Sequence, residues 1–322
     1  MTSKVRWGII GAGRIANTFA ADSRLVPDAT LAAVASRSLA SAQSFAARYG
    51  GIRAYGSYSS LFEDDQIDVV YIATPHNLHN EQVRAAISRG KAVLCEKPIT
   101  VTPDECRSLQ EYARSRRIYL MEGMWTWFLP AIRKAQNWIE AGRIGRVLHV
   151  NATFGYPLPY DPVRREYDSL LAGGCLLEMG IYPIAIAALF MAEDPESIEV
   201  VCHRAPNGVE DDVAILYRYT GGSSAALATS FRCKLPNWAY VIGTDGYIAI
   251  PNFWRANSCT LYQLDAVLDY YQEDYRGSGF EYQIAAVAAD VQARRLESTL
   301  VPAAASLRFQ TQLARIRALC PG

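Results

Sequence analysis

The alternation of strand and helix patterns over residues 1–122 limits this chain to few folds. The apolar, strand-like runs in this region are 5–11, 30–36, 54–55, 69–74, 92–98 and 118–123. Helical patterns separate most of these runs, and such alternation is typical of a parallel sheet with helices on both faces. The sequence therefore predicts an α/β fold, with a doubly wound parallel sheet over residues 1–122.

The pattern changes after residue 123. Strand-like stretches follow one another at 197–205, 211–222, 223–233, 238–251 and 259–264. Because no helix separates them, we expect one large, mostly antiparallel sheet. Helices are expected at 129–142, 174–192, 280–298 and 304–320. A length of 322 residues suits two domains, so residues 123–322 are predicted to form a second, α+β domain.

Composition and charge argue against several classes of binding partner. The chain has 32 Lys and Arg against 32 Asp and Glu, so we expect no nucleic-acid or membrane partner. No run of 18 apolar residues predicts a membrane span, and the apolar run near the N-terminus is too short for a signal peptide. The seven scattered cysteines lack zinc spacing, which favours reduced thiols, a cytoplasmic location and no metal site.

The first apolar run ends in a glycine-rich turn, Gly11-Ala12-Gly13-Arg14-Ile15-Ala16. In a G-x-G-x-x-A motif the first glycine permits a tight turn, and the second lets the backbone approach a pyrophosphate at the helix N-terminus. Its position at the first strand–helix junction is the context that supports this interpretation. The turn therefore predicts a dinucleotide-binding site.

The end of the second strand carries Ser36 and Arg37. A site for NAD usually places Asp or Glu here to hold the ribose hydroxyls, whereas a hydroxyl followed by Arg suits a 2′-phosphate. A solvated Arg in a loop is the alternative. The local pattern favours NADP(H) as the cofactor.

Polar residues also follow the next strands. Thr74-Pro75-His76-Asn77-Leu78-His79 comes after the run at 69–74, where the loop is expected either to line the cofactor site or to be an ordinary connection. Glu96-Lys97-Pro98 ends the following run. A Lys at the carboxyl edge of such a sheet can bind a substrate hydroxyl and stabilise a developing alkoxide, and Glu96 can orient it. The alternative is a strand end that reaches water.

The last signal is Gly173-Gly174 followed by a helical pattern that contains Glu178 and Tyr182. These two side chains are four residues apart, so they share one helix face. A tyrosine near a Lys ammonium can exchange a proton at neutral pH. Taken alone, the pair indicates no more than a packed tyrosine and a surface glutamate.

Together these stretches resemble the Gfo/Idh/MocA oxidoreductases. The resemblance rests on residues 11–16, 74–79, 95–98 and 173–182, and it covers essentially the whole chain. Within the family, residues 122–131 and 243–254 are most similar to the branch of trans-1,2-dihydrodiol dehydrogenase and NADP-dependent D-xylose dehydrogenase. It implies an N-terminal Rossmann domain, a C-terminal substrate-binding domain and a homodimer formed through the large sheet.

The resemblance also implies roles for individual residues. Lys97 matches the lysine that contacts the substrate hydroxyl, and Tyr182 matches the proton-transfer residue. Glu178 stands where the family usually has Asp, which leaves a direct substrate contact open. The aromatic residues at matching substrate positions are Trp125, Phe154, Trp254 and Phe280. By strand alternation, Trp125 and Trp127 are expected to share a face, with core packing as the alternative.

We therefore expect an NADP-dependent dehydrogenase or reductase that moves hydride between nicotinamide and a hydroxyl-bearing carbon of a sugar, polyol or trans-dihydrodiol. The residues expected to bind the cofactor are Gly11, Gly13, Arg14, Ile15, Ser36, Arg37, Thr74, Pro75, His76, Asn77, His79, Glu96 and Lys97. Two alternatives remain: a nicotinamide-dependent glycoside hydrolase and a non-enzymatic sugar or cofactor sensor.

Overall fold

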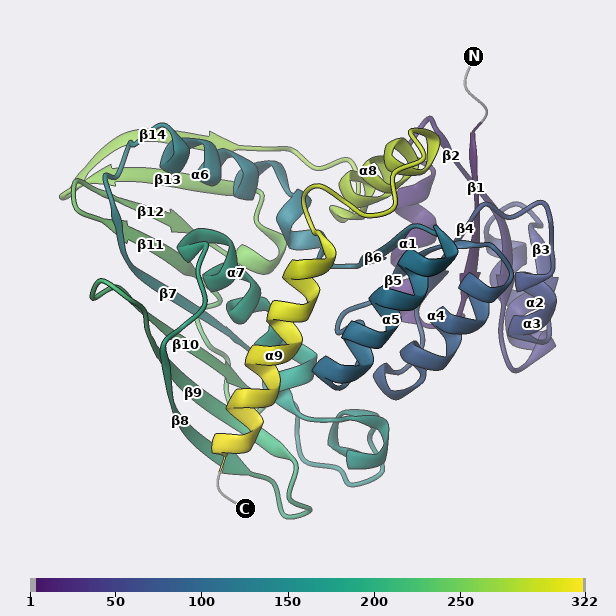
Figure 1. The fold of residues 1–322 in the computed structure, drawn as a ribbon, viewed down its shortest axis with the longest axis horizontal. Helices are drawn as coiled ribbons and strands as arrows, with labels where there is room; N and C mark the ends of the chain where they lie inside the picture. Colours follow the sequence, from purple (N-terminus) through teal and green to yellow (C-terminus); the bar gives the residue numbers. More distant parts are fainter. Residues whose placement is uncertain (1–3, 321–322) are drawn as a thin grey trace. The chain divides into compact units, whose positions relative to one another are not determined.

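The computed structural model describes residues 4–320, which divide into two compact units. Unit 1 runs to Trp125 and also includes Tyr275–Leu307. Unit 2 contains Thr126–Asp274 and the residues from Arg308 onward. Figure 1 shows a sheet in each unit, and the two units are described separately below.

The sheet of unit 1 has six strands in the order β3-β2-β1-β4-β5-β6, and every pair of neighbours is parallel. The strands are β1 Val5–Ile10, β2 Ala29–Ala35, β3 Arg53–Tyr55, β4 Val69–Ile72, β5 Ala92–Cys95 and β6 Leu120–Glu122. This order reverses between β1 and β4, the point at which doubly wound sheets bind their ligands. The predicted α/β fold is therefore confirmed.

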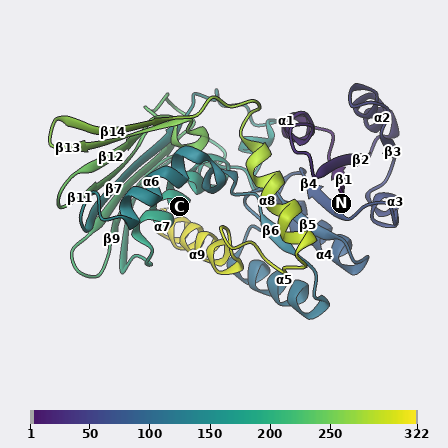
Figure 2. The same cartoon turned by 90° about the horizontal axis from the view of Figure 1, so that it is seen from above.

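Helices cover both faces of this sheet, as Figure 2 shows for α1 and for α4 and α5. The helical segments are α1 Arg14–Ser23, α2 Leu39–Arg48, α3 Tyr58–Phe62, η1 His76–Leu78, α4 His79–Ser88, α5 Pro103–Arg116 and α8 Phe280–Gln292. The start of α5 is fixed locally by a capping box between Thr102 and Glu105. A buried apolar core lies between the sheet and α3, α4 and α5.

Residues 275–307 differ from the predicted domain organisation, which assigned everything after residue 122 to the second domain. Helix α8 packs against α1, β1 and β2, and so it belongs to the parallel sheet unit. The contact is polar as well as apolar, because the Asp22 carboxylate on α1 accepts hydrogen bonds from the backbone N–H groups of Ser278 and Phe280. A contact between segments so distant in sequence leaves no local pattern.

The sheet of unit 2 has eight strands in the order β14-β13-β12-β11-β7-β10-β9-β8. They are β7 Val147–Gly155, β8 Ser197–Arg204, β9 Glu210–Arg218, β10 Ser224–Ser230, β11 Ala239–Gly243, β12 Tyr247–Ile250, β13 Ser258–Gln263 and β14 Ala266–Gln272. Only the pair β7 and β10 is parallel among these described strands, so the prediction of a mostly antiparallel sheet is confirmed. The stretch 238–251 is a hairpin of two strands, and β14 was not predicted.

The remaining helical segments are η2 Trp125–Phe128, α6 Pro130–Glu140, η3 Arg165–Tyr167, η4 Ser169–Leu171, η5 Leu176–Gly180, α7 Ile181–Met191, η6 Phe253–Arg255 and α9 Ala303–Leu319. Helix α7 packs on β7, β10 and β11, and α6 packs on β12, β13 and β14. Ser169–Met191 has the length and the mean hydropathy, 1.8, of a membrane span, but 83% of its apolar window is buried inside the structure. That burial is the pattern of a core helix.

Candidate active site

The glycine turn at the end of β1 is shaped as the motif predicts. Gly11 has φ +91°, and a Cβ there would lie 2.5 Å from the carbonyl oxygen of Ala73. Gly13 is the N-cap of α1 with an ordinary φ of −83°, and no side chain of the described residues caps the helix. Within residues 4–320, no atom outside its own neighbours lies within 4 Å of a Cβ built on Gly13. The helix therefore opens onto space next to uncapped N–H groups.

Ser36 and Arg37 lie beside this turn, because β2 pairs with β1 and Ala35 O accepts the Gly11 N–H. Ser36 is half-buried and Arg37 is exposed. The Arg37 charge reaches Tyr58, where it opposes the burial that raises the pKa of that phenol. An exposed cationic side chain thus follows the strand that pairs with β1.

The loop after β4 reaches the same edge of the sheet. Pro75 is the N-cap of η1, His76 is buried and Asn77 is exposed. His79 is fully buried, and its two ring nitrogens lie 2.8 Å from Pro98 O and 2.9 Å from Thr74 O. His79 therefore joins the loop after β4 to the turn that follows Lys97. Its predicted contact with the cofactor stays a prediction.

Lys97 lies two residues beyond the end of β5, and its peptide bond to Pro98 is cis. It is partly exposed, whereas the preceding Glu96 is 7% exposed. The Tyr71 hydroxyl donates to Glu96 Oε1 at 2.5 Å, and the Tyr71 ring stacks on Phe19 of α1 with centroids 3.8 Å apart. A buried carboxylate held by a phenol thus adjoins a lysine at the carboxyl edge of the sheet.

Two of the predicted substrate residues meet inside unit 1. Trp125 and Phe280 stack with ring centroids 4.7 Å apart, although they are far apart in the sequence. The backbone before Phe280 is held by two carboxylates: Asp22 accepts from Ser278 and Phe280, and Glu281 accepts from Gly277 and Gly279. Burial and the adjacent Glu281 carboxylate together raise the pKa of Asp22 to about 6, against the hydrogen bonds from the Ser278 and Phe280 N–H groups, which lower it.

Unit 2 gathers the other aromatic residues around Tyr182. Phe154 stacks on Trp254 with centroids 5.0 Å apart and meets the Tyr182 ring edge-on at 5.3 Å. Tyr182 is 6% exposed, and Tyr156 contacts the edge of Phe154. Phe154, Trp254 and Tyr182 therefore form one aromatic cluster, and their roles toward a substrate stay predictions.

Glu178 lies on η5, which is a π-helix that runs into α7. Such widened turns often occur at functional sites. Its carboxylate forms a close ion pair with Arg165 of η3, and the paired charge raises the pKa of Arg165. Arg165 was missed by the sequence analysis, because it lies 13 positions before Glu178 and no periodic pattern links the two residues.

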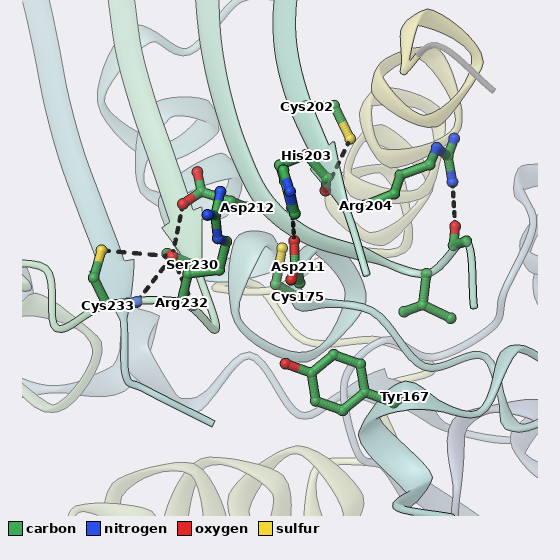
Figure 3. A network of polar contacts seen from close by, with 12 residues as sticks. Tyr167, Cys175, Cys202, His203, Arg204, Asp211, Asp212, Ser230, Arg232 and Cys233 are labelled. Atoms are coloured by element: carbon green, nitrogen blue, oxygen red, sulfur yellow. Dashed lines mark hydrogen bonds and ion pairs between the residues drawn. The ribbon is translucent and has the colours of Figure 1, made fainter. Parts of the chain in front are cut away.

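Cys175, the N-cap of η5, senses the charges of acidic residues on β9, and Figure 3 shows two of these, Asp211 and Asp212, with their polar partners. A Cβ on Gly174 would lie 2.5 Å from Glu210 Oε1, so only glycine lets the backbone pass this carboxylate. The Thr229 hydroxyl donates to Cys175 O, and Asp211 lies 2.6 Å from the His203 ring nitrogen on the adjacent strand. The contacts of Gly174 and Cys175 hold the N-terminal end of the helix that carries Glu178 and Tyr182.

Trp127 corrects one prediction. Residues 125–128 form the 3-10 helix η2 and not a strand, so strand alternation does not apply to Trp125 and Trp127. Trp127 is buried and packs edge-on against Phe309 of α9, with centroids 5.3 Å apart. It is a core residue of unit 2, which was the alternative considered.

The geometry fits a dinucleotide at the end of β1. The open space at Gly13 and the uncapped start of α1 are the features that a pyrophosphate requires. Within residues 4–320, no group of three or more His, Cys, Asp or Glu side chains could hold a metal ion.

Comparison with known proteins agrees with this geometry. Residues 5–124 match the family model described as "Oxidoreductase family, NAD-binding Rossmann fold", and residues 132–249 match the "GFO/IDH/MocA C-terminal domain". The chain belongs to the Gfo/Idh/MocA family. As a member of this family it is a nicotinamide-dependent oxidoreductase of the dehydrogenase/reductase class, as predicted.

Curated members of the family match over most of the chain. The trans-1,2-dihydrobenzene-1,2-diol dehydrogenase of Mus musculus is 39% identical over 253 residues, which cover 78% of this chain and 75% of the relative. The Homo sapiens protein of the same name is 38% identical and covers 77% and 75%. These matches confirm the branch that the sequence resembles.

Solved structures of the family share the fold over nearly the full length. The 3-ketoreductase KijD10 from Actinomadura kijaniata, solved with NADP and TDP-benzene, has a TM-score of 0.87 at 26% identity and covers 99% of this chain and 98% of its own. An aldose–aldose oxidoreductase from Caulobacter crescentus has a TM-score of 0.90 at 22% identity and covers 98% and 97%. The second likeness concerns the fold alone.

Proposed function

We propose that this chain is an NADP(H)-dependent dehydrogenase or reductase that acts on a hydroxyl-bearing carbon of a sugar, polyol or trans-dihydrodiol. One observation carries the proposal: Gly11, Thr74 and Lys97 follow three neighbouring parallel strands, β1, β4 and β5, at the switch point of the sheet. A ligand at this edge can contact the glycine turn and the lysine together.

The nicotinamide, when bound, supplies the hydride acceptor or donor. The chain's own residues handle the proton and the oxygen. In the oxidation direction, the predicted role of Tyr182 is to take the hydroxyl proton, and that of Lys97 is to hold the oxygen as negative charge develops on it. In reduction Tyr182 returns the proton. The Glu96 carboxyl adjoins Lys97 in the sequence, and the hydrogen bond that it accepts from Tyr71 holds it in place.

NADP is proposed over NAD because of Ser36 and Arg37. Both end the strand next to the glycine turn, and neither offers the carboxylate that would hold free ribose hydroxyls. The KijD10 structure, which contains NADP, is consistent with this choice.

The substrate class is proposed from the aromatic residues. Phe154, Trp254 and Tyr182 form one cluster in unit 2, and Trp125 and Phe280 form another in unit 1. Aromatic faces suit both the apolar face of a sugar and a cyclohexadiene ring. The relatives include a dihydrobenzenediol dehydrogenase and a 3-ketoreductase that was solved with TDP-benzene.

The test is steady-state turnover with NADP⁺ and NADPH across aldoses, ketoses, polyols and trans-dihydrodiols. Lys97→Met and Tyr182→Phe should each lower kcat about 100-fold or more while NADPH affinity stays within about threefold. Tyr270→Phe, on an exposed tyrosine of β14, serves as the control. Full activity of Lys97→Met would reject the assignment, and a silent panel with tight NADH binding would favour the hydrolase or sensor alternatives.

We also propose a homodimer through the exposed face of the unit 2 sheet and a cytoplasmic location. On this face Val201 and Leu216 are 76% and 48% exposed, and small Ala214 and Ala226 lie in register beside them. Such an exposed, partly apolar face suits a second copy of the chain. Analytical ultracentrifugation should give a dimer for the wild type and a monomer for Leu216→Lys, and a monomeric wild type would refute this part.

A further inference from the structure

Glu122 is a buried acid that the proposed mechanism does not use. It ends β6, pairs in register with Cys95 of β5, and is 1% exposed. Its Oε1 accepts the Ile99 N–H at 2.9 Å. The next residue, Gly123, donates its N–H to Cys95 O at 2.6 Å. The carboxyl therefore reaches from β6 across to the turn that immediately follows Lys97.

The second carboxyl oxygen of Glu122, Oε2, differs from Oε1 in its hydrogen bonding. Within residues 4–320, Oε2 is buried without a hydrogen-bond partner, although the Ser306 hydroxyl is near enough to lower the pKa of the acid. A cavity of about 180 Å³ adjoins it, and the lining extends to the exposed Arg114 and Glu297. The cavity gives a buried acid a route for proton exchange with solvent.

The pKa of Glu122 depends on the charges of Glu96 and Lys97 in the turn after β5. The pKa of Glu122 is raised to about 7. Burial and the Glu96 charge raise it, while the Ser306 hydroxyl, the Ile99 N–H and the Lys97 charge lower it. Because such coupling is reciprocal, an ionised Glu122 favours the ammonium form of Lys97. The other titratable groups that sense this carboxyl are the buried thiols Cys95 and Cys106.

We propose that Glu122 is a positioning residue for Lys97, holding the turn from Lys97 to Ile99 through the Ile99 N–H and attracting the Lys97 ammonium through its own charge. His79 holds the same turn from the other side, because its ring contacts Pro98 O. The turn is thus fixed at two consecutive residues by buried side chains from α4 and β6. This inference rests on the proposed role of Lys97.

Two substitutions separate the hydrogen bond from the charge. Glu122→Gln keeps an oxygen that accepts the Ile99 N–H but is neutral at every pH. Glu122→Met has similar length, removes both, and leaves the Ile99 N–H buried without an acceptor. Val301→Ala is the matched control, since Val301 lines the same cavity and is 1% exposed.

The measurement is kcat from pH 5.5 to 9, together with NADPH affinity. We expect Glu122→Met to lower kcat about 10-fold or more and Glu122→Gln to restore most of it below pH 6. The ratio of wild-type to Glu122→Gln kcat should then rise about fivefold as pH increases through about 7, where the wild-type acid ionises. NADPH affinity should stay within about threefold in every variant, and Val301→Ala should keep wild-type kcat.

A folded Glu122→Met with wild-type kcat would overturn the inference, as would a ratio that does not change with pH. Two readouts do not need turnover: hydrogen exchange at the Ile99 amide, and acylation of Lys97 followed by peptide mass spectrometry. Both should increase in Glu122→Met and stay near wild type in Val301→Ala. If the wild type turned over no substrate, the proposed function would fail, and these two readouts would still decide the role of Glu122.

Discussion

Gly11 and Gly13 belong to one motif, but the structure requires glycine at these positions for different reasons. At Gly11 a methyl group would meet Ala73 O at 2.5 Å, and φ is +91°. Both conditions exist in the protein without any ligand. At Gly13 φ is −83° and the space for a methyl group is open within the described residues. A requirement for glycine at Gly13 must therefore come from the molecule that binds there.

Replacing each glycine by alanine should therefore change protein stability and NADPH affinity in different ways. Gly11→Ala should cost about 1–2 kcal/mol for the left-handed backbone and about 1–3 kcal/mol for the collision with the carbonyl oxygen. Gly13→Ala should change stability by less than about 1 kcal/mol, since a small loss at the N-cap is offset by a less flexible unfolded chain. Its methyl group would, however, occupy the space of the pyrophosphate, which should weaken NADPH about 10- to 100-fold.

The assay is thermal unfolding without nucleotide, followed by titration of tryptophan fluorescence with NADPH. We expect Gly11→Ala to unfold several degrees below the wild type, and Gly13→Ala to unfold within about 2 °C of it but to bind weakly. Wild-type NADPH affinity in Gly13→Ala would refute the placement of the pyrophosphate. Strong destabilisation of nucleotide-free Gly13→Ala would refute the argument that the glycine serves the ligand.

Three further results are expected. Arg37→Ala should weaken NADPH about 10- to 100-fold and leave NADH affinity unchanged, measured by the same titration; equal losses for both would contradict a 2′-phosphate contact. Asp22 has a pKa raised from 3.8 to about 6, so its stabilising contribution is complete below pH 4 and is lost as pH rises through 6. Between pH 4 and 7, chemical denaturation should show the wild type losing up to about 2 kcal/mol relative to Asp22→Asn, and parallel pH profiles would count against the shift. Arg165→Met should raise KM about 10-fold and leave NADPH affinity unchanged, because it releases Glu178; an unchanged KM would remove Glu178 from the substrate site.

The sequence by itself determined the structural features that depend only on residues close together in the chain. The glycine turn needs one residue with positive φ, and Gly11 provides it. The start of α5 needs a capping side chain and an acid three residues later, and Thr102 and Glu105 are both visible in the sequence. The order of strands and helices in residues 1–122 followed from hydrophobic periodicity, because each element buries an apolar face of its own.

Only the tertiary structure decided which distant residues act together. Trp125 stacks on Phe280, and Asp22 accepts the Phe280 N–H, because the chain comes back to the parallel sheet at α8. No pattern in the local sequence predicts such a return. The ion pair of Glu178 with Arg165 joins η5 to η3, and η5 itself packs against β7, β9 and β10.

Glu122 illustrates the same division. In the sequence it is the polar end of a short apolar run, which any strand end can have. In the fold, β6 pairs with β5, and this register brings the acid to the Ile99 N–H beside Lys97. The pKa of Glu122 is then raised to about 7, with burial as the largest cause. A local pattern fixes which residues enter a strand, but the environment of a charge is set by long-range pairing and desolvation.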